Sequence, residues 1–436
     1  TTSRRRPGLI TGFIVGLAVD AFLIYSMVDT DSSPPPPPEV KKKDTAGGRG
    51  ACFSGAVFES AQRRDWMKLA FTQPEDGALH LQLRDLLQEV DYIDHLALLR
   101  VEHAEGSEVV PTEDGRLLEC TLTAPRSAVD DGGRDVRSLV TGGTERWWLS
   151  HPAGRINGSK PLRAEASPDR PGLTVTFPKP ADTDSITLVA RLQNTDWGAQ
   201  LHYGFFGLFG EALPAQYELW NSDQKARVDL HQPMLCEGML RVSIQTGDGW
   251  QVAGYYWEVG LAAFRSVALP LDISGIEGDA LTLRFDAPAG VWMIAEVGID
   301  GASPRTVTPE RIPVAAAERH DGGNCTENFR TDTDTESPSG SDCTENLRTE
   351  DGRHLILDTG EWADVRFDVP AGEIPTGRHV TWVLESSGYY RMKLDSTQPA
   401  QTATLQRIFG ESGYFAQFAA ELWRARVSAE LAKTER

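Results

Sequence analysis

The chain has 436 residues, of which 40% are hydrophobic and 24% are charged, and its 63 acidic residues outnumber its 43 basic ones. This composition is typical of a folded protein with two or three domains and excludes a chain that is disordered throughout. The net charge of −20 argues against nucleic acid as the main partner, because phosphate binding requires a basic surface. The sequence contains no phosphate-binding glycine loop, zinc signature or nucleophile elbow, so it specifies no reaction.

An apolar segment near the N-terminus predicts a membrane helix. Residues 9–28 read LITGFIVGLAVDAFLIYSMV, which is long enough to cross a bilayer. Arginines at positions 4–6 precede this segment, so we expect residues 1–8 in the cytoplasm and the bulk of the chain in the periplasm. A cleaved signal peptide is the competing interpretation, but its apolar region would usually be shorter and no A-x-A cleavage site is present. We therefore expect a single-pass protein of the inner membrane.

One face of this predicted helix carries small residues four positions apart. Gly8, Gly12 and Gly16 form the row, and Asp20 continues it. Such a row lets a second helix approach closely, and a carboxyl inside a bilayer must be protonated, hydrogen-bonded or turned towards protein. An ordinary membrane helix with a protonated Asp20 is the plainer alternative. We expect the four residues to pack against an integral membrane protein.

Residues 29–50 have the composition of a linker. Pro34 to Pro38 predict a stiff polyproline spacer. The first fifty residues hold seven basic and five acidic groups, a net charge of +2, so the remaining 386 residues carry −22.

The remainder of the chain contains an internal repeat. Seven blocks recur in the same order at offsets of about 184 to 203 residues, which predicts homologous modules at 51–235 and 236–436. The blocks are 77–85 and 279–287, 90–98 and 291–299, 130–135 and 320–325, 173–177 and 363–367, 186–192 and 380–386, 208–220 and 408–423, and the pairs Cys52–Trp66 and Cys236–Trp250.

Each module is predicted to be mainly β. Segments such as LHLQL, LTVTF and LTLRF alternate apolar and polar residues, and turn signals such as EDG and DDGG separate them. Each module ends in a segment with helical spacing of apolar residues. We therefore expect a transmembrane helix followed by two tandem jelly-roll-like β-sandwich modules, each with a C-terminal helix. The blocks GWQVAGYYWEVG, VALPLDISGIEGDALTLRF and GVWMIAEVGID resemble sandwiches of the galactose-binding, carbohydrate-module type.

The second module carries a loop insertion at 324–350. The insertion contains the local duplication CTENFRTD and CTENLRTE, and a disulfide between Cys325 and Cys343 could close it. Cys52 and Cys236 occupy equivalent places in the repeat, which favours two buried free thiols over a bond between them.

Two groups of side chains are candidate binding sites. An acidic turn could hold calcium, although solvated carboxylates are the plainer interpretation; it consists of Asp130, Asp131 and Asp135. Exposed aromatic rings could stack on a glycan, although aromatic residues in sandwiches more often belong to the core; the candidate platform is Trp147, Trp148, Tyr256 and Trp257. No two of the nine histidines share a ligand spacing, so we expect no catalytic site and no cofactor.

This organisation predicts a non-catalytic accessory or scaffold subunit. The layout resembles the single-pass accessory subunits of bacterial respiratory or photosynthetic reaction-centre–light-harvesting complexes. That resemblance implies integral membrane subunits and the lipid bilayer as partners, and the acidic modules could steer a basic electron carrier. A membrane-anchored envelope protein that binds glycan is the alternative.

Overall fold

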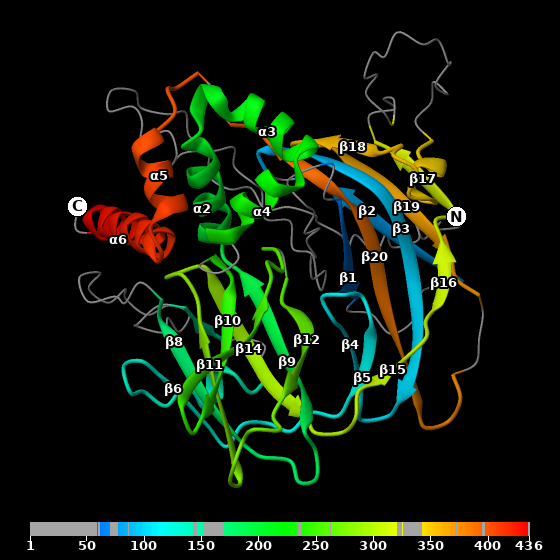
Figure 1. Ribbon diagram of the computed structural model, residues 1–436. Coiled ribbons are helices and arrows are strands. Elements are labelled where there is room, and N and C mark those ends of the chain that lie inside the picture. Colours follow the sequence, from blue (N-terminus) through cyan, green and yellow to red (C-terminus); the bar gives the residue numbers. More distant parts are fainter. Residues whose placement is uncertain are drawn as a thin grey trace. The chain divides into compact units, whose positions relative to one another are not determined.

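The computed structural model describes residues 59, 62–69, 77–85, 87–142, 146–150, 170–233, 238–261, 263–320, 325, 342–370, 374–394 and 397–434 (Figure 1). The protein is mainly β. The predicted membrane segment with Gly8, Gly12, Gly16 and Asp20, the linker, Cys52 and Cys236 lie outside the described residues. Within the described part, no helix has both the length and the apolar character that a membrane span requires.

The chain forms two compact units, and each takes residues from separate parts of the sequence. Unit 1 comprises Thr1–Arg100, Glu310–Pro375 and Trp382–Lys393. Unit 2 comprises Val101–Pro309, Thr376–Thr381 and Leu394–Arg436.

Unit 1 contains two antiparallel sheets. The first has the order β1 (Arg63–Lys68), β20 (Arg378–Met392), β3 (Glu89–Ala104) and β16 (Glu310–Pro313), and β18 (Leu355–Asp358) also pairs with β3. The second has the order β17 (Ala316–Arg319), β19 (Trp362–Asp368) and β2 (Ala78–Arg84). Leu79, Leu81 and Leu83 of β2 are buried, whereas His80 between them is exposed. This alternation is the period of a strand with one face in the core.

Unit 2 contains three sheets. The outer sheet has the order β11 (Gly249–Tyr256), β10 (Leu240–Thr246), β13 (Ala280–Asp286), β8 (Gly172–Pro178) and β6 (Ser127–Asp130). The middle sheet has the order β12 (Arg265–Asp272), β9 (Ser185–Asn194), β14 (Trp292–Asp300) and β7 (Trp148–Leu149). The small sheet consists of β15 (Arg305–Thr306), β5 (Leu117–Cys120) and β4 (Glu108–Pro111).

Both faces of the middle sheet are packed. On one side, Tyr256 Oη of the outer sheet donates to Leu188 O of β9 at 3.2 Å. On the other side, Val110 and Leu118 of the small sheet form an apolar cluster with Val189 of β9. The outer sheet therefore keeps one face towards the middle sheet and turns its other face away from the core.

Helices of unit 2 follow β9 and β20 and gather into one group (Figure 1). They are α2 (Asp196–Gly207), α3 (Leu213–Ser222), α4 (Gln224–Pro233), α5 (Thr402–Gly410) and α6 (Tyr414–Thr434), and the 3-10 turn η5 (Gly210–Ala212) joins α2 to α3. Two further 3-10 turns lie elsewhere, η3 (Arg137–Leu139) in unit 2 and η7 (Glu345–Leu347) in unit 1. Thr195 caps α2 by accepting a hydrogen bond from Gly198 N. Aromatic rings join the helices, for example Phe205 with Phe415 at 5.6 Å between ring centroids.

The internal repeat is visible in the strand pairing. In unit 1, Leu79 of β2 lies opposite Phe367 of β19. In unit 2, Leu281 of β13 lies opposite Phe177 of β8. The sequence blocks 77–85 and 279–287 superpose Leu79 on Leu281, and the blocks 173–177 and 363–367 superpose Phe177 on Phe367. The two units therefore pair equivalent strands in the same register.

The units do not coincide with the modules expected at 51–235 and 236–436. In each unit a strand from one half of the chain pairs with a strand from the other half: β2 with β19, and β13 with β8. Because the two repeats present similar apolar faces, a strand of one repeat fits the partner strand of the other. The pairs Cys52–Trp66 and Cys236–Trp250 are the block that the structure does not superpose. Trp66 lies on β1, which pairs with β20, whereas Trp250 lies on β11, which pairs with β10.

Candidate functional site

The candidate site is the solvent-facing side of the outer sheet. Directly opposite residues of antiparallel strands point to the same side of a sheet, so the strand register defines the face. Across the sheet, Val252 lies opposite Ser243, Ser243 opposite Arg284, Arg284 opposite Thr174, and Thr174 opposite Val129. A second row of opposite residues lies beside the first. Together the two rows form the outer face, which consists of Ser127, Val129, Thr174, Thr176, Ser243, Gln245, Trp250, Val252, Thr282 and Arg284; of these, Ser243 is only 5% exposed.

The intervening residues confirm the direction of this face. Ala128, Val175, Val242 and Leu283 alternate with members of the outer face, and each is 0% exposed. A strand places successive side chains on opposite sides, so the members of the outer face point away from the core.

Apolar side chains remain accessible on this face. Trp250 is 45% exposed, Val252 is 52% exposed and Val129 is 37% exposed. Trp250 and Val252 lie on β11, which pairs only with β10 among the described strands. The edge of β11 therefore combines apolar side chains with backbone groups that a further strand could pair.

Charge on the outer face is neutralised locally. Arg284 is held by the carboxylate of Asp131, with Nη1–Oδ1 and Nη2–Oδ2 distances of 2.7 and 3.1 Å. This hydrogen bonding raises the pKa of Arg284 above its usual value, against the opposing effect of burial. Thr176 and Thr282 place their hydroxyls 3.3 Å apart. The face thus presents hydroxyl, amide and apolar groups on a protein of net charge −20.

The equivalent face of unit 1 has different chemistry. There, His80 lies opposite Arg366 and Asp364 lies opposite Glu318. The matching pairs of unit 2 are Thr282 with Thr176 and Thr174 with Val129. The same fold therefore accepts charged residues at these positions, and the weakly polar surface is particular to unit 2.

The predicted aromatic platform is not assembled. Trp148 and Tyr256 are each 0% exposed, and burial raises the pKa of Tyr256 well above its usual value. Trp147 packs against the Phe264 ring, with centroids 5.7 Å apart. Trp257 keeps 36% exposure, and its backbone N donates to Glu113 at 3.3 Å. Sequence reasoning treated neighbouring aromatic residues as one surface, although alternation along a strand sends neighbours to opposite sides. The alternation of apolar residues along 249–252 would by itself place Trp250 in the core, and only the pairing of β11 with β10 shows that it faces outwards.

The predicted acidic turn is used for hydrogen bonds within the fold. Asp130 accepts from the backbone N of Gly132 and Arg134 at 2.9 and 3.0 Å and forms an ion pair with Arg134. Asp135 accepts from Arg137 N at 2.9 Å. Because Asp131 binds Arg284, the three carboxylates do not converge on a common point.

Cys325 and Cys343 are bonded in the structure. Their sulfurs are 2.11 Å apart and their Cα atoms 5.4 Å apart, and both residues are buried. Cys120 is a buried free thiol, and burial raises its pKa to about 12. A thiol with such a pKa carries little thiolate at neutral pH and is a poor nucleophile.

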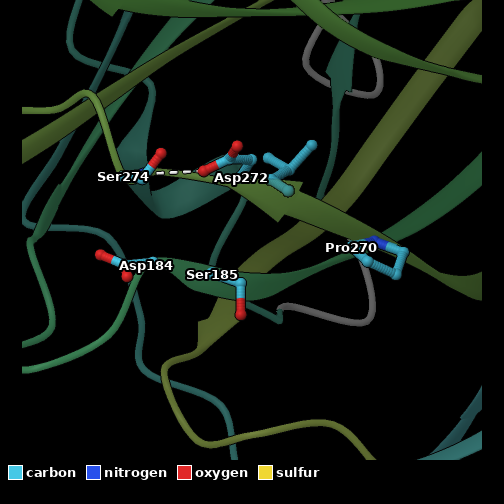
Figure 2. Close-up of a pocket in the computed structure, with 6 residues that line it drawn as sticks. Asp184, Ser185, Pro270, Asp272 and Ser274 are labelled. Atoms are coloured by element: carbon cyan, nitrogen blue, oxygen red, sulfur yellow. Dashed lines mark hydrogen bonds between the residues drawn. The ribbon is translucent and has the colours of Figure 1, made fainter.

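A hollow of 440 Å³ lies between the start of β9 and the end of β12 (Figure 2). Its polar lining is Asp184, Ser185, Asp272 and Ser274. The carboxylate of Asp272 accepts from Ser274 N at 2.8 Å, which lowers its pKa below the usual value. Asp272 therefore serves to stabilise a turn and is poorly suited to accept a proton from a substrate.

Three buried carboxylates in unit 1 converge, although no motif in the sequence marks them. Asp85, Glu89 and Asp91 each direct a ligand atom to within 4.8 Å of the others. Burial raises the pKa of Asp85 to about 9, with a further contribution from the charge of Asp91, and burial raises the pKa of Asp91 to about 7. These are the residues in the described part that could together hold a metal ion.

Comparisons with known proteins leave the family open. No family model matches the sequence, and no curated protein matches it. Among solved structures, the chain is similar to a GH31 alpha-xylosidase from Xanthomonas citri, with 8% identity, a TM-score of 0.18, and coverage of 75% of this chain and 28% of that one. The chain thus spans less than a third of the length of the xylosidase. It is also similar to a chain from Sulfolobus Turreted Icosahedral Virus, with 8% identity, a TM-score of 0.17, and coverage of 76% and 91%.

Proposed function

We propose that this protein is a non-catalytic scaffold subunit that holds a protein partner on the exposed outer face of unit 2. The accessible Trp250 and Val252 on the edge strand β11 carry this proposal. According to this proposal, residues 9–28 form a single helix that anchors jelly-roll-like modules outside the cytoplasm. The partner then belongs to an integral membrane complex of the respiratory or photosynthetic type.

The apolar side chains of Trp250 and Val252 are suited to a protein interface. A Trp side chain supplies a large contact area with little loss of conformational entropy, and tryptophan dominates the binding energy of many interfaces. The free edge of β11 offers main-chain hydrogen bonds to a partner strand, which is the β-augmentation mode of recognition. A neutral face also avoids the desolvation of charge that burying the equivalent face of unit 1 would require.

The acidic surface supports a second role within the same proposal. A net charge of −20 on the whole chain attracts basic proteins and accelerates their encounter at low ionic strength. A basic electron carrier would be steered in this way.

Glycan binding is the second candidate, and Trp250 favours it. An exposed indole can stack on a sugar ring, and Gln245 and Thr282 on the same face supply amide and hydroxyl groups for hydrogen bonds. In this candidate function the stacking surface is the single indole of Trp250, and the four-residue aromatic platform predicted from the sequence plays no part.

The test is purification of the full chain from membranes in mild detergent, comparing wild type with Trp250→Ala and Leu219→Ala. Leu219 is 42% exposed on α3 and provides a matched control outside the face. We expect integral membrane subunits to co-purify with wild type and with the control, and Trp250→Ala to weaken the complex about 30-fold, the equivalent of roughly 2 kcal/mol.

Other outcomes decide against the proposal. If the chain purifies alone and retains polysaccharide in a pull-down that Trp250→Ala abolishes, glycan binding replaces scaffolding. If Trp250→Ala and Leu219→Ala behave like wild type in both assays, the outer face is not the binding surface.

A further inference from the structure

We propose that Asp85, Glu89 and Asp91 of unit 1 form a binding site for a calcium ion. This site lies in a different unit from the outer face and does not depend on the proposed scaffold function.

The three carboxylates have the spacing that one ion requires. Asp85 follows β2, and Glu89 and Asp91 lie at the start of β3. One ligand atom of each lies within 4.8 Å of the others. Because Ca²⁺–O distances are about 2.3–2.6 Å, two oxygens bound to the same ion can be up to roughly 5 Å apart.

The site is enclosed, and one of its oxygens lacks a partner. Asp85 is 0% exposed, Asp91 is 2% exposed and Glu89 is 8% exposed. Asp85 Oδ1 accepts from Leu87 N at 2.8 Å, whereas the buried Oδ2 has no hydrogen-bond partner among the described residues. A buried carboxylate oxygen without a donor is strongly unfavourable, and a cation bound to it would remove that penalty.

The neighbouring positive charge is already engaged. Lys393 Nζ contacts the carboxylate of Asp358 and lies 3.1 Å from Thr359 Oγ1. Asp358 therefore already compensates the charge of Lys393, whereas Asp85 and Asp91 repel one another when both are ionised. A divalent cation bound between these two carboxylates would replace that repulsion by attraction.

Backbone hydrogen bonds fix the loop that carries the site. Asp85 N donates to Glu361 O at 3.1 Å, and Gly360 N donates to Asp85 O at 2.8 Å. Lys393 N donates to Gln88 O at 2.7 Å. The end of β2 and the start of β3 are thus held by the β18–β19 turn and by the residue after β20, so the carboxylates are positioned without an ion.

The fold itself does not require acidic residues at these places. In the repeat, Asp85 corresponds to Ala287 and Asp91 to Trp292, and both counterparts are buried in unit 2. Apolar side chains therefore satisfy the same positions of the same topology. Buried carboxylates are more costly than these residues, which points to a chemical role for them in unit 1.

The identity of the ion follows from the ligands. All three ligands are carboxylates, and the triad contains neither histidine nor cysteine, which zinc and copper prefer. Calcium accepts several protein carboxylates in one site, whereas magnesium usually keeps most of its water shell.

The experiment uses the full chain in detergent, stripped with EDTA and titrated with CaCl₂ or MgCl₂ at pH 8. We expect calcium to give a saturable binding heat and to raise Tm by roughly 5–10 °C at about 100 times Kd. Magnesium should require at least a tenfold higher concentration.

Matched variants separate the site from general acidity. Asp91→Asn should abolish the calcium-dependent shift in Tm and leave the calcium-free Tm unchanged or higher, because it removes buried like-charge repulsion. Asp368→Asn, at an exposed carboxylate of β19, should keep the full response. Wild type with no binding heat and no shift in Tm would show that the triad is a proton-sharing cluster only. An equal response to magnesium would overturn the assignment to calcium, and an equal response of Asp91→Asn would overturn the site.

Discussion

The exchange of strands between the two halves of the chain predicts that neither half folds alone. The perturbation is expression of residues 51–235 and residues 236–436 as separate polypeptides. In the intact protein, Leu79, Leu81 and Leu83 of β2 are 4%, 6% and 2% exposed, and they lie on a strand that pairs with β19 in the second half.

The size of the effect follows from these buried side chains. Burying one leucine side chain stabilises a fold by about 1.5–3 kcal/mol, so three contribute roughly 5–9 kcal/mol. A whole protein is typically stable by only about 5–15 kcal/mol. Fragment 51–235 also loses β13, the partner of β8. The loss from these strands is therefore comparable to the total stability.

The assays are near-UV circular dichroism, limited proteolysis and urea unfolding of each fragment and of the co-expressed pair. We expect each fragment alone to lack fixed tertiary structure and the pair to recover the cooperative transition of the intact chain. A monomeric fragment 51–235 with cooperative unfolding would refute the reasoning, because it would mean that β2 pairs with β8 of its own half.

Three further predictions concern unit 1. Glu385 is 1% exposed and forms ion pairs with Arg311 and, at 3.2 Å, with Arg64. Glu385→Ala should lower the free energy of unfolding in urea by about 2–3 kcal/mol. This is less than the roughly 3–5 kcal/mol lost when a fully buried pair is broken, because both arginines are half exposed. No change in the urea midpoint would mean that the pairs contribute nothing. Reduction of the Cys325–Cys343 bond, which spans 18 residues, should cost about 3 kcal/mol and lower Tm in dithiothreitol; an unchanged Tm would contradict this. In EDTA, the raised pKa values of Asp85 (about 9) and Asp91 (about 7) mean that these two carboxyls hold more protons in the native state than in the unfolded state above pH 4, so their contribution to the free energy of unfolding falls as pH rises to about 9. Burial lowers the pKa of His95 and His354, which acts in the opposite direction near pH 6, so the comparison is made between pH 7 and pH 9. In urea unfolding, wild type should lose more stability over this interval than Asp91→Asn, and an equal loss would contradict the reasoning.

Local patterns in the sequence determined the strands and their inward faces. The alternation in GALHLQLRD and LTVTF predicted both the strands β2 and β8 and their buried residues, because a half-buried strand repeats every two residues. The repeat blocks also placed equivalent strands correctly, since the register in the two units superposes Leu79 on Leu281.

Only the tertiary structure decided which strands became partners and which side chains met. Homologous strands offer nearly the same apolar face to either half of the chain, so the sequence could not distinguish β2 pairing with β8 from β2 pairing with β19. Likewise, Asp85 and Asp91 look like ordinary polar residues around a turn. Their meeting as buried carboxylates depends on the β18–β19 turn and the end of β20, which are brought to them from more than 260 residues away by long-range strand pairing.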